Sequence, residues 1–347
     1  MRMRVLGGTG IKVSPYCFGA MNFGNWANTD REDAVRIINA ALDGGINFID
    51  TADMYSAGQS EQIVGRAIKD RRDDVVLATK FHGPMGEDVN QRGNSRRWIA
   101  RAVEDSLRRL DTDHIDLYQI HRPDPDTDIE ETLSALTDLV RAGKIRAFGS
   151  STFPAELIVE AHWASEKRGF ERLRTEQPPY SILNRSIESA VLPTTQRYGM
   201  GVLVWSPLSG GWLAGKYRNG VDLSTGRAAF LPGMFDPTLP DNARKVEAVE
   251  ALAKIAADVG CSLTHLAMAF SIAHPGVSSS IIGPRTLEQL DDLLAGADLV
   301  LDDETLDRID EVVAPGTAVN AGDSHYTPRE ISETGLRRRP TATRSAA

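Results

Sequence analysis

Four side chains that can move protons or hold charge stand at or just after the ends of apolar runs: Asp50, Tyr55, Lys80 and His121. A phenol titrates near pH 10, and a cation beside it favours the phenolate, which lowers the pKa of the phenol toward useful acid chemistry. Lys80 is the expected cation and Asp50 its partner, because a lysine in a partly dry site needs a counter-ion to stay charged. These residue types predict that Tyr55 delivers a proton to a carbonyl oxygen, while His121 orients the carbonyl or assists the transfer.

Such a site has no reductant of its own, so a hydride is expected to come from a bound cofactor. Taken singly, each side chain has an ordinary explanation: Tyr55 as a surface tyrosine, Lys80 as a solvated lysine and His121 as a core histidine. The functional interpretation depends on all of them standing at the same end of successive strands. A metal-dependent barrel hydrolase is the distant alternative, because the seven histidines are scattered and no strand end offers His-x-His. No metal site is expected.

Short apolar or β-branched runs alternate with longer segments of helical period along most of the chain. The runs expected to form strands are Tyr16–Ala20, Ile46–Asp50, Val75–Lys80, Ile115–Ile120, Ile145–Gly149, Arg172–Gln177, Gly201–Trp205 and Ser279–Gly283. The segments expected to form helices are Arg31–Asp43, Ser60–Lys69, Ser95–Leu110, Ile129–Arg141, Pro154–Lys167 and Ser189–Tyr198. This alternation predicts an α/β protein with a parallel sheet, and eight units favour closure into a (β/α)8 TIM barrel over an open sheet. Chemistry in that fold lies at the C-terminal ends of the strands.

Two segments outside the repeating units have predicted roles: the start of the chain and the long loop after the seventh strand. Val5–Gly10 looks like the start of a dinucleotide-binding loop, but Val13 replaces the third glycine and a proline interrupts the following helix. An N-terminal β-hairpin across the base of the barrel is therefore expected, with Gly7–Gly10 as its turn. A long loop after the seventh strand begins with Ser206–Pro240 and is a candidate lid or binding loop. An extra C-terminal helix is expected after the barrel.

Residues 1–317 are predicted to form a single domain and 318–347 a flexible C-terminal tail, because the tail has little to bury.

The formal net charge of −9 argues against a nucleic-acid partner, because phosphates select basic surfaces. Cys17 and Cys261 make no disulfide framework or metal-binding motif. No apolar run reaches the roughly 18 to 20 residues of a membrane span, and no signal peptide is expected. We expect a cytoplasmic protein without a membrane or nucleic-acid partner.

Four segments combine into a specific pattern: Gly45–Tyr55, Ser60-Glu61 with Gly65, Ile115–His121 and Gly143–Gly149. With this combination the chain resembles the aldo-keto reductases, which are NAD(P)H-dependent carbonyl reductases on a (β/α)8 barrel. The resemblance extends from about Val5 to Pro315, and it implies NADPH/NADP+ as cofactor. The catalytic tetrad of that family falls on the same four residues that their chemistry selects, namely Asp50, Tyr55, Lys80 and His121.

The resemblance also implies a cofactor site, in which Ser151 and Gln177 bind the nicotinamide carboxamide and Trp205 stacks on the ring. The other positions implied to contact the cofactor are Gly19, Met21, Asp50, Ser206, Pro207, Leu208, Gly210, Lys216, Gly283, Arg285, Gln289 and Asp292. Thr152 and Leu293 stand where many members of the family have asparagine. The contacts to the carboxamide and to the adenine are therefore expected to differ from theirs.

Four cations are expected around the ribose 2′-phosphate of the cofactor: Lys216, Arg218, Arg227 and Arg285. They predict tighter binding of NADPH than of NADH, because a phosphate accepts charge-assisted hydrogen bonds. A substrate pocket with partly apolar walls suits aromatic or aliphatic carbonyl compounds. The residues expected to line this pocket are Trp26, Met54, Phe81 and His82.

The segment Trp205-Ser206-Pro207-Leu208 and the long loop behind it are most similar to one branch of the family. That branch includes the potassium-channel beta subunits and bacterial general aldo/keto reductases, and so contains both enzymes and regulatory partners. The first hypothesis is reduction of a small-molecule aldehyde or ketone by hydride transfer from nicotinamide, with Tyr55 as proton donor. The alternative is a cofactor-sensing regulatory or binding subunit with slow residual reductase activity. The tetrad does not separate the two, and the substrate and oligomeric state stay open.

Overall fold

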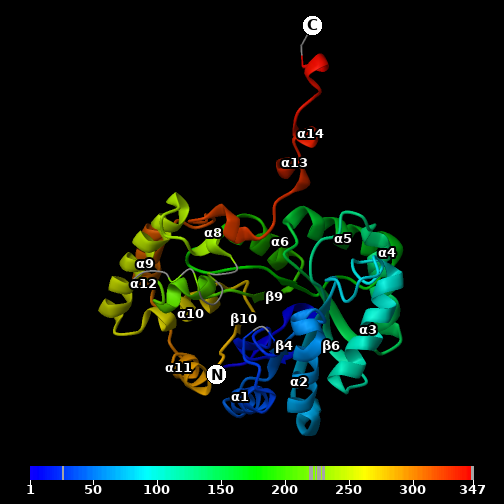
Figure 1. Ribbon diagram of the computed structural model, residues 1–347, viewed down its shortest axis with the longest axis horizontal. Helices are drawn as coiled ribbons and strands as arrows, with labels where there is room; N and C mark the ends of the chain where they lie inside the picture. The colour runs from blue at the N-terminus through cyan, green and yellow to red at the C-terminus, as the bar shows by residue number, and fades with distance from the viewer. Residues whose placement is uncertain (26, 219–221, 223, 225–227, 229–230, 345–347) are drawn as a thin grey trace.

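The computed structural model describes residues 1–25, 27–218, 222, 224, 228 and 231–344. Eight parallel strands close into a barrel in the order β10-β3-β4-β5-β6-β7-β8-β9, and helices surround them (Figure 1). The strands are β3 (Tyr16–Gly19), β4 (Phe48–Asp50), β5 (Val76–Phe81), β6 (Ile115–Ile120), β7 (Ile145–Ser151), β8 (Thr175–Gln177), β9 (Gly201–Val204) and β10 (Ser279–Ile282). The (β/α)8 barrel predicted from the alternation of the sequence is confirmed.

The six predicted helices begin and end close to their expected bounds. They are α1 (Arg31–Asp43), α2 (Gln59–Ile68), α3 (Arg96–Leu110), α4 (Ile129–Arg141), α5 (Ala155–Arg168) and α6 (Val191–Arg197). Side chains of Asp30, Ser95 and Asp128 accept backbone N–H groups at the starts of α1, α3 and α4, which satisfies donors that a helix leaves unpaired. The later helices are α8 (Pro232–Phe235), α9 (Pro240–Val259), α10 (Leu263–Ala273), α11 (Leu287–Ala295) and α12 (Asp303–Val312). The extra helix predicted after the barrel is α12.

Alternation along each strand separates the interior of the barrel from the layer between strands and helices. An apolar cluster inside the base of the barrel combines Leu6, Val13, Cys17, Phe48, Ala78, Leu117, Ala147 and Leu203. Two larger clusters pack the outer faces of the strands against the helices. Polar side chains replace the apolar ones farther along the same strands, toward their C-terminal ends, which we call the mouth.

A hairpin covers the base of the barrel, as predicted. Strand β1 (Arg4–Val5) pairs antiparallel with β2 (Lys12–Val13), and the turn between them contains Gly7 at a φ of 53°. A Cβ at Gly7 would lie 2.2 Å from the backbone nitrogen of Gly201, so only glycine allows this close approach to β9.

The segment 318–326 after α12 packs on the barrel, and we call it the strap. Its Val319 N–H donates to the carbonyl of Leu183 at 2.9 Å. Asp323 is buried, accepts from Nζ of Lys245 at 2.9 Å, and its backbone carbonyl accepts from Asn184 at 2.7 Å. The tail was predicted to begin at 318, but the chain leaves the barrel only after this segment. The strap has no apolar periodicity in the sequence, because three polar contacts hold it in place.

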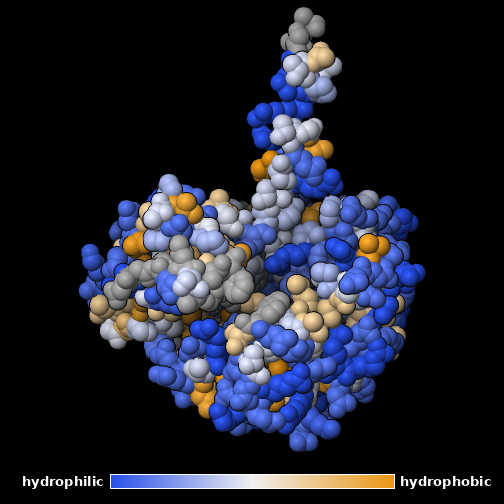
Figure 2. Space-filling view, in the orientation of Figure 1, coloured by the Kyte–Doolittle hydropathy of each residue, from blue (hydrophilic) through white to orange (hydrophobic). Residues whose placement is uncertain are grey.

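Beyond the strap the chain projects away from the barrel and carries two short helices, α13 (Arg329–Ser332) and α14 (Thr334–Arg337) (Figure 1). Figure 2 shows a largely hydrophilic face with scattered hydrophobic residues. In the described ranges no helix alone is long and apolar enough to cross a bilayer; α9 and α10 meet those criteria only jointly, across a bend of 92°.

Candidate active site

A buried ion pair joins two neighbouring strands at the mouth. Lys80 on β5 is fully buried, and its Nζ lies 2.5 Å from Oδ1 of Asp50 at the end of β4. The same ammonium donates to the carbonyl oxygen of Thr51 at 2.8 Å and to the hydroxyl of Tyr55 at 3.3 Å. Lys80 therefore has three oxygen partners for its three N–H donors, which a buried ammonium needs. The pairing of Lys80 with Asp50 agrees with the expectation from the strand ends.

Two amides from across the barrel satisfy the second carboxylate oxygen of Asp50. Gln119 on β6 donates to Oδ2 at 3.1 Å, and Gln177 on β8 donates to it at 2.9 Å. Gln177 also donates to Oε1 of Gln119 at 3.2 Å. Asp50 thus holds Lys80 while the opposite wall of the barrel holds Asp50.

Burial and charge oppose each other at Lys80 and Tyr55. Burial alone lowers the pKa of Lys80, but the charge of Asp50 and the hydrogen bonds to Asp50 and Tyr55 outweigh it, and the pKa is raised. Burial raises the pKa of the Tyr55 hydroxyl, and the charges of Lys80 and Arg122 offset only part of this rise. The expectation that Lys80 gives Tyr55 a lowered pKa is therefore wrong for the net value. Tyr55 stays protonated at neutral pH, as a proton donor must.

His121 directly follows β6 and faces Tyr55 edge to face, with ring centroids 5.7 Å apart and planes at 82°. Its Nδ1 is buried and has no hydrogen-bond partner among the described residues. Burial, with the charges of Lys80, Arg122 and His82, lowers the pKa of His121 well below its ordinary value. The imidazole is therefore neutral at pH 7, and it can hydrogen-bond an uncharged carbonyl oxygen without transferring a proton.

A strained turn brings Tyr55 back over the mouth. Tyr55 opens the 3-10 turn Tyr55–Gly58, in which Ser56 and Ala57 have φ values of 49° and 53°. Left-handed non-glycine residues cost about 1–3 kcal/mol each, so the surrounding structure must hold the turn in place. Ser56 does so by donating from Oγ to the carbonyl of Phe23 at 3.1 Å. The turn thereby keeps the Tyr55 hydroxyl beside Lys80.

The residues expected at the nicotinamide end lie around the same mouth. Ser151 Oγ donates to the carbonyl of Gln177 at 2.8 Å, and the amide of Gln177 is engaged by Asp50. Trp205 follows β9, and its Nε1 is buried without a hydrogen-bond partner in the described part of the chain. The Trp205 ring, expected to stack on nicotinamide, has the ring of His325 from the strap at a centroid distance of 4.7 Å.

Gly19 and Met21, expected in the first loop of the cofactor site, lie at and just after the end of β3. A Cβ at Gly19 would approach Cγ2 of Ile281 to 2.6 Å, so glycine is required where β3 packs on β10. Met21 is half-buried. The close packing of the two strands gives Gly19 a structural reason that does not involve a ligand.

The segment expected near the pyrophosphate has an unusual backbone. Ser206, Ser209 and Gly210 have φ values of 58°, 47° and 68°. Pro207 is buried and Leu208 is half-buried in the same segment. Successive backbone N–H groups in turns of this kind can form anion-binding concavities. This segment therefore suits the phosphates of a dinucleotide.

The four cations expected near the 2′-phosphate differ in their surroundings. Lys216 and Arg285 are exposed. Arg218 instead makes two hydrogen bonds of 2.7 Å to Glu250, which leaves less of its guanidinium for a phosphate. Arg227 lies outside the described residues.

The residues expected at the adenosine half gather at the end of β10 and on α11. The Oε1 of Gln289 accepts the backbone N–H of Arg285 at 2.9 Å, which ties the two residues together. Gly283 and Asp292 are exposed at the same edge. With the unpaired indole and imidazole nitrogens at the mouth and the exposed cations Lys216 and Arg285, these residues fit a nicotinamide dinucleotide.

The residues expected around the substrate separate into two groups. Met54 and His82 lie on the loops after β4 and β5, where a Cβ added to Gly83 would touch Met54, and His82 Nδ1 lies 2.9 Å from Oδ1 of Asn94. Phe81 instead is fully buried and packs on Tyr118 at a centroid distance of 4.9 Å. Because Lys80 points into the barrel, its neighbour Phe81 must point outward to the helices. Trp26 lies outside the described residues.

Three residues of the mouth were not selected from the sequence. Gln119 was detectable, because it stands two residues before His121 on a strand and so shares its inward face. Arg122 follows His121 directly, but its role depends on contacts to residues distant in the chain. His325 had no signal, because it lies in a segment without apolar periodicity.

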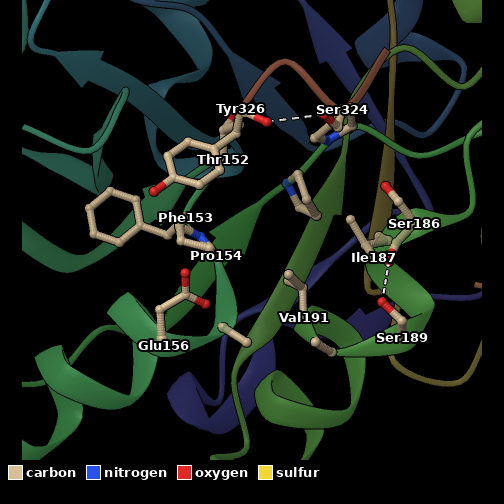
Figure 3. Close-up of a pocket in the computed structure, with 14 residues that line it drawn as sticks. Thr152, Phe153, Pro154, Glu156, Ser186, Ile187, Ser189, Val191, Ser324 and Tyr326 are labelled. Atoms are coloured by element: carbon tan, nitrogen blue, oxygen red, sulfur yellow. Dashed lines mark hydrogen bonds between the residues drawn. The ribbon is translucent and has the colours of Figure 1, made fainter. Parts of the chain in front are cut away.

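An apolar pocket lies beside the mouth, between the start of α5, the loops after β8 and the strap. Figure 3 shows Tyr326 over Thr152 and Phe153 on one side of it, and Ile187 and Val191 on the other. Thr152 lines this pocket, and its hydroxyl accepts a hydrogen bond from Nη1 of Arg122 at 3.1 Å. The pocket therefore shares one residue with the surroundings of the tetrad.

Comparisons with known proteins agree with this arrangement. Residues 15–314 match the sequence profile of the aldo/keto reductase family. The chain is 39% identical over 324 residues to an uncharacterized oxidoreductase, YrpG, of Bacillus subtilis strain 168, covering 90% of this chain and 96% of that protein. It is also 39% identical over 295 residues to the aldo-keto reductase YhdN of the same organism, covering 82% and 85%. A probable voltage-gated potassium channel subunit beta of Oryza sativa is 36% identical over 323 residues, covering 90% and 97%.

Proposed function

Because the chain belongs to the aldo/keto reductase family, we propose that it reduces an aldehyde or ketone to the alcohol with NADPH, with Tyr55 as proton donor. One observation carries the proposal: the Tyr55 hydroxyl lies 3.3 Å from Nζ of the buried Lys80, with His121 edge-on to the Tyr55 ring. A protonated phenol, a fixed cation and a neutral imidazole at one mouth suit the protonation of a carbonyl oxygen.

With Ser151, Gln177 and Trp205 around its nicotinamide ring, bound NADPH would supply the hydride for the carbonyl carbon. Tyr55 gives its hydroxyl proton to the oxygen as negative charge develops there. Lys80 stabilises the resulting phenolate, because an opposite charge within hydrogen-bond distance favours the ionised form. Asp50 keeps Lys80 charged and in place, and the neutral His121 orients the carbonyl oxygen by a hydrogen bond.

The preference for NADPH rests on Lys216 and Arg285, which are exposed and form no ion pair with any other described residue. Each charge-assisted contact to the 2′-phosphate contributes roughly 1.5–3 kcal/mol, or about one to two decades in affinity. Lys216→Met and Arg285→Met should each weaken NADPH binding and leave NADH binding nearly unchanged. Equal dissociation constants of the unmodified protein for NADPH and NADH at low salt would remove this cofactor assignment.

The reductase itself is tested with a panel of aldehydes and ketones, following nicotinamide absorbance separately with NADPH and with NADH. We expect repeated turnover of at least one carbonyl compound with NADPH. Tight NADPH binding without turnover of any member of the panel would contradict the proposal.

A cofactor-sensing regulatory subunit is the second candidate, favoured by the similarity to the rice protein named as a probable potassium channel subunit beta. Single-turnover and steady-state measurements with the best carbonyl separate the two. A regulatory subunit would oxidise its bound NADPH once and slowly, whereas an enzyme would turn over many times. The intact tetrad is compatible with both results.

A further inference from the structure

The guanidinium of Arg122 crosses the mouth of the barrel. Arg122 directly follows His121, and its Nη1 donates to the carbonyl of His121 at 2.7 Å and to the hydroxyl of Thr152 at 3.1 Å. Its Cζ lies 5.7 Å from the centroid of the Trp205 ring. The side chain therefore reaches from the end of β6, past β7, toward β9, and its charge acts on the Tyr55 hydroxyl.

This guanidinium is half-buried, yet it has no carboxylate partner among the described residues. Its hydrogen bonds to described residues all come from Nη1, so Nε and Nη2 retain their donors. A partly desolvated cation with two donor groups that no described residue accepts is costly to maintain, because such charges are normally paired. An anionic ligand would supply the missing partner.

The carboxylates near the mouth do not pair with Arg122. Asp53, in the loop after β4, is fully buried, and burial with the charge of Glu61 raises its pKa well above the ordinary value. Asp50 is paired with Lys80, and Asp323 of the strap is paired with Lys245. Asp124 accepts from the backbone of Asn94 and from the hydroxyl of Thr127.

Another carboxylate, Glu176, is fully buried beside β7, where it accepts from the hydroxyl of Ser150 and the backbone N–H of Phe153. The other titratable groups at the mouth are Lys80, Tyr55 and three histidines, His82, His121 and His325, none of which carries negative charge at neutral pH. The mouth is therefore cationic in a protein whose net charge is −9.

We propose that Arg122 binds an anionic group of the substrate, so that the preferred substrates are carbonyl compounds that carry a carboxylate or a phosphate ester. This inference rests on the proposed reductase function for its substrate class. The planar fork of arginine matches both kinds of oxyanion, and Nε and Nη2 point one edge of that fork away from its protein contacts. With the anion held there, the substrate has a fixed end, and its carbonyl is oriented toward Tyr55.

Two matched pairs of aldehydes test the proposal in the presence of NADPH: 4-carboxybenzaldehyde against methyl 4-formylbenzoate, and glyceraldehyde 3-phosphate against glyceraldehyde. The unmodified protein should show a higher kcat/KM for the charged member of at least one pair. Arg122→Met should reduce that preference about 10- to 100-fold, chiefly through KM, and Arg122→Lys should retain part of it. The pair that shows the preference identifies carboxylate or phosphate as the group bound.

Arg141 provides the matched control. It is exposed at the end of α4, four positions before β7 begins at the base of the barrel, so Arg141→Met removes the same charge far from the mouth. This variant should keep the charged-substrate preference. Equal loss in Arg141→Met would assign the preference to the overall field of the protein and overturn the site.

A binding measurement separates failure of the site from failure of the reductase. Benzoate and its neutral counterpart benzamide are titrated into the NADPH-loaded protein, following its thermal midpoint. Benzoate should stabilise the unmodified protein, and Arg122→Met should abolish that shift. If neither aldehyde pair is reduced but benzoate still binds through Arg122, the reductase fails and the anion site stands. If Arg122→Met reduces kcat/KM equally for charged and neutral aldehydes, or benzoate does not bind, Arg122 serves only to hold the loops and the inference is overturned.

Discussion

At the base of the barrel, Phe48 and Ala78 lie in an apolar cluster closed by the N-terminal hairpin. Two residues farther along the same strands stand Asp50 and Lys80, joined as a buried ion pair. Because side chains alternate along a strand, both pairs point into the same interior. Two residues along each strand therefore separate the packed core of the barrel from the site for chemistry.

The two ends also differ in how polar the barrel interior is. At the mouth, His121 Nδ1 and Trp205 Nε1 are buried without hydrogen-bond partners among the described residues. The only side chain of the base cluster that titrates is Cys17, and burial raises its pKa well above the ordinary value. Buried unpaired polar groups cost about 1–3 kcal/mol each, so the mouth is held in a less stable arrangement than the base. The base therefore contributes stability, and the mouth contains buried groups that reduce it.

The largest expected effects come from breaking the mouth. Tyr55→Phe should lower carbonyl reduction by about two to four decades and leave NADPH binding intact, because it removes only the proton donor. Lys80→Met should lower activity similarly and also destabilise the fold by about 3–5 kcal/mol, because it leaves Asp50 buried without its cation. Activity is measured as kcat/KM on the best carbonyl, and stability by urea unfolding.

The double variant serves as the control for this pair. Because Tyr55 and Lys80 act as one unit, it should be scarcely slower than the worse single variant. Additive losses would mean independent roles. If Tyr55→Phe kept most of its activity, another group would have to be the donor.

The matching change at the base is Leu117→Ala. Leu117 is fully buried in the base cluster, so its truncation should cost about 2–5 kcal/mol in the free energy of unfolding. The kcat/KM of the folded fraction should stay within about threefold, in contrast to the mouth variants. A loss of activity larger than the loss of folded protein would show that the base also shapes the site.

A smaller effect, a dependence of the free energy of unfolding on pH, is expected from Glu176 on β8. Burial raises the pKa of Glu176 to about 7, although hydrogen bonds from Ser150 and from the backbone of Phe153 act in the opposite direction. The folded protein therefore holds a proton on Glu176 that the unfolded chain has released, and stability falls as pH rises from about 4.5 to 7. The loss amounts to about 3 kcal/mol at most. Urea unfolding at pH 5.5 and 8 should show a smaller fall for Glu176→Gln; equal falls in both proteins would contradict the assignment.

The smallest effect is expected from the projecting tail. Every described residue from 329 to 344 is exposed, so removing 329–347 should shift the thermal midpoint by less than about 1 °C. Removing 322–347 is the control, because it also takes Asp323 from the buried Lys245 and should cost about 3–5 kcal/mol. Differential scanning calorimetry of the two truncations should separate strap from tail. Equal midpoints would show that the strap contributes no stability.

Much of the fold follows from local pattern. The spacing of apolar residues predicted eight strands and six helices, because burial of one face imposes a period on the sequence. The positions of Asp50 and Lys80 also predicted their pairing, because neighbouring parallel strands end at the same edge of the barrel. The same alternation predicts that Gln119 faces inward beside His121 and that Phe81, next to the inward Lys80, faces outward and not into the pocket.

The barrel, the level of each strand at which polar residues begin and the types of those residues are all encoded in local sequence pattern. Three features instead require the folded chain: burial outweighs Lys80 at the Tyr55 hydroxyl, Asp323 ties the strap to Lys245, and Arg122 crosses to Trp205. Each of these depends on residues far apart in the chain and on how much water the closed loops exclude. Periodicity encodes which face of an element is buried, whereas the partners and solvation of a polar group are set when separate loops meet in space.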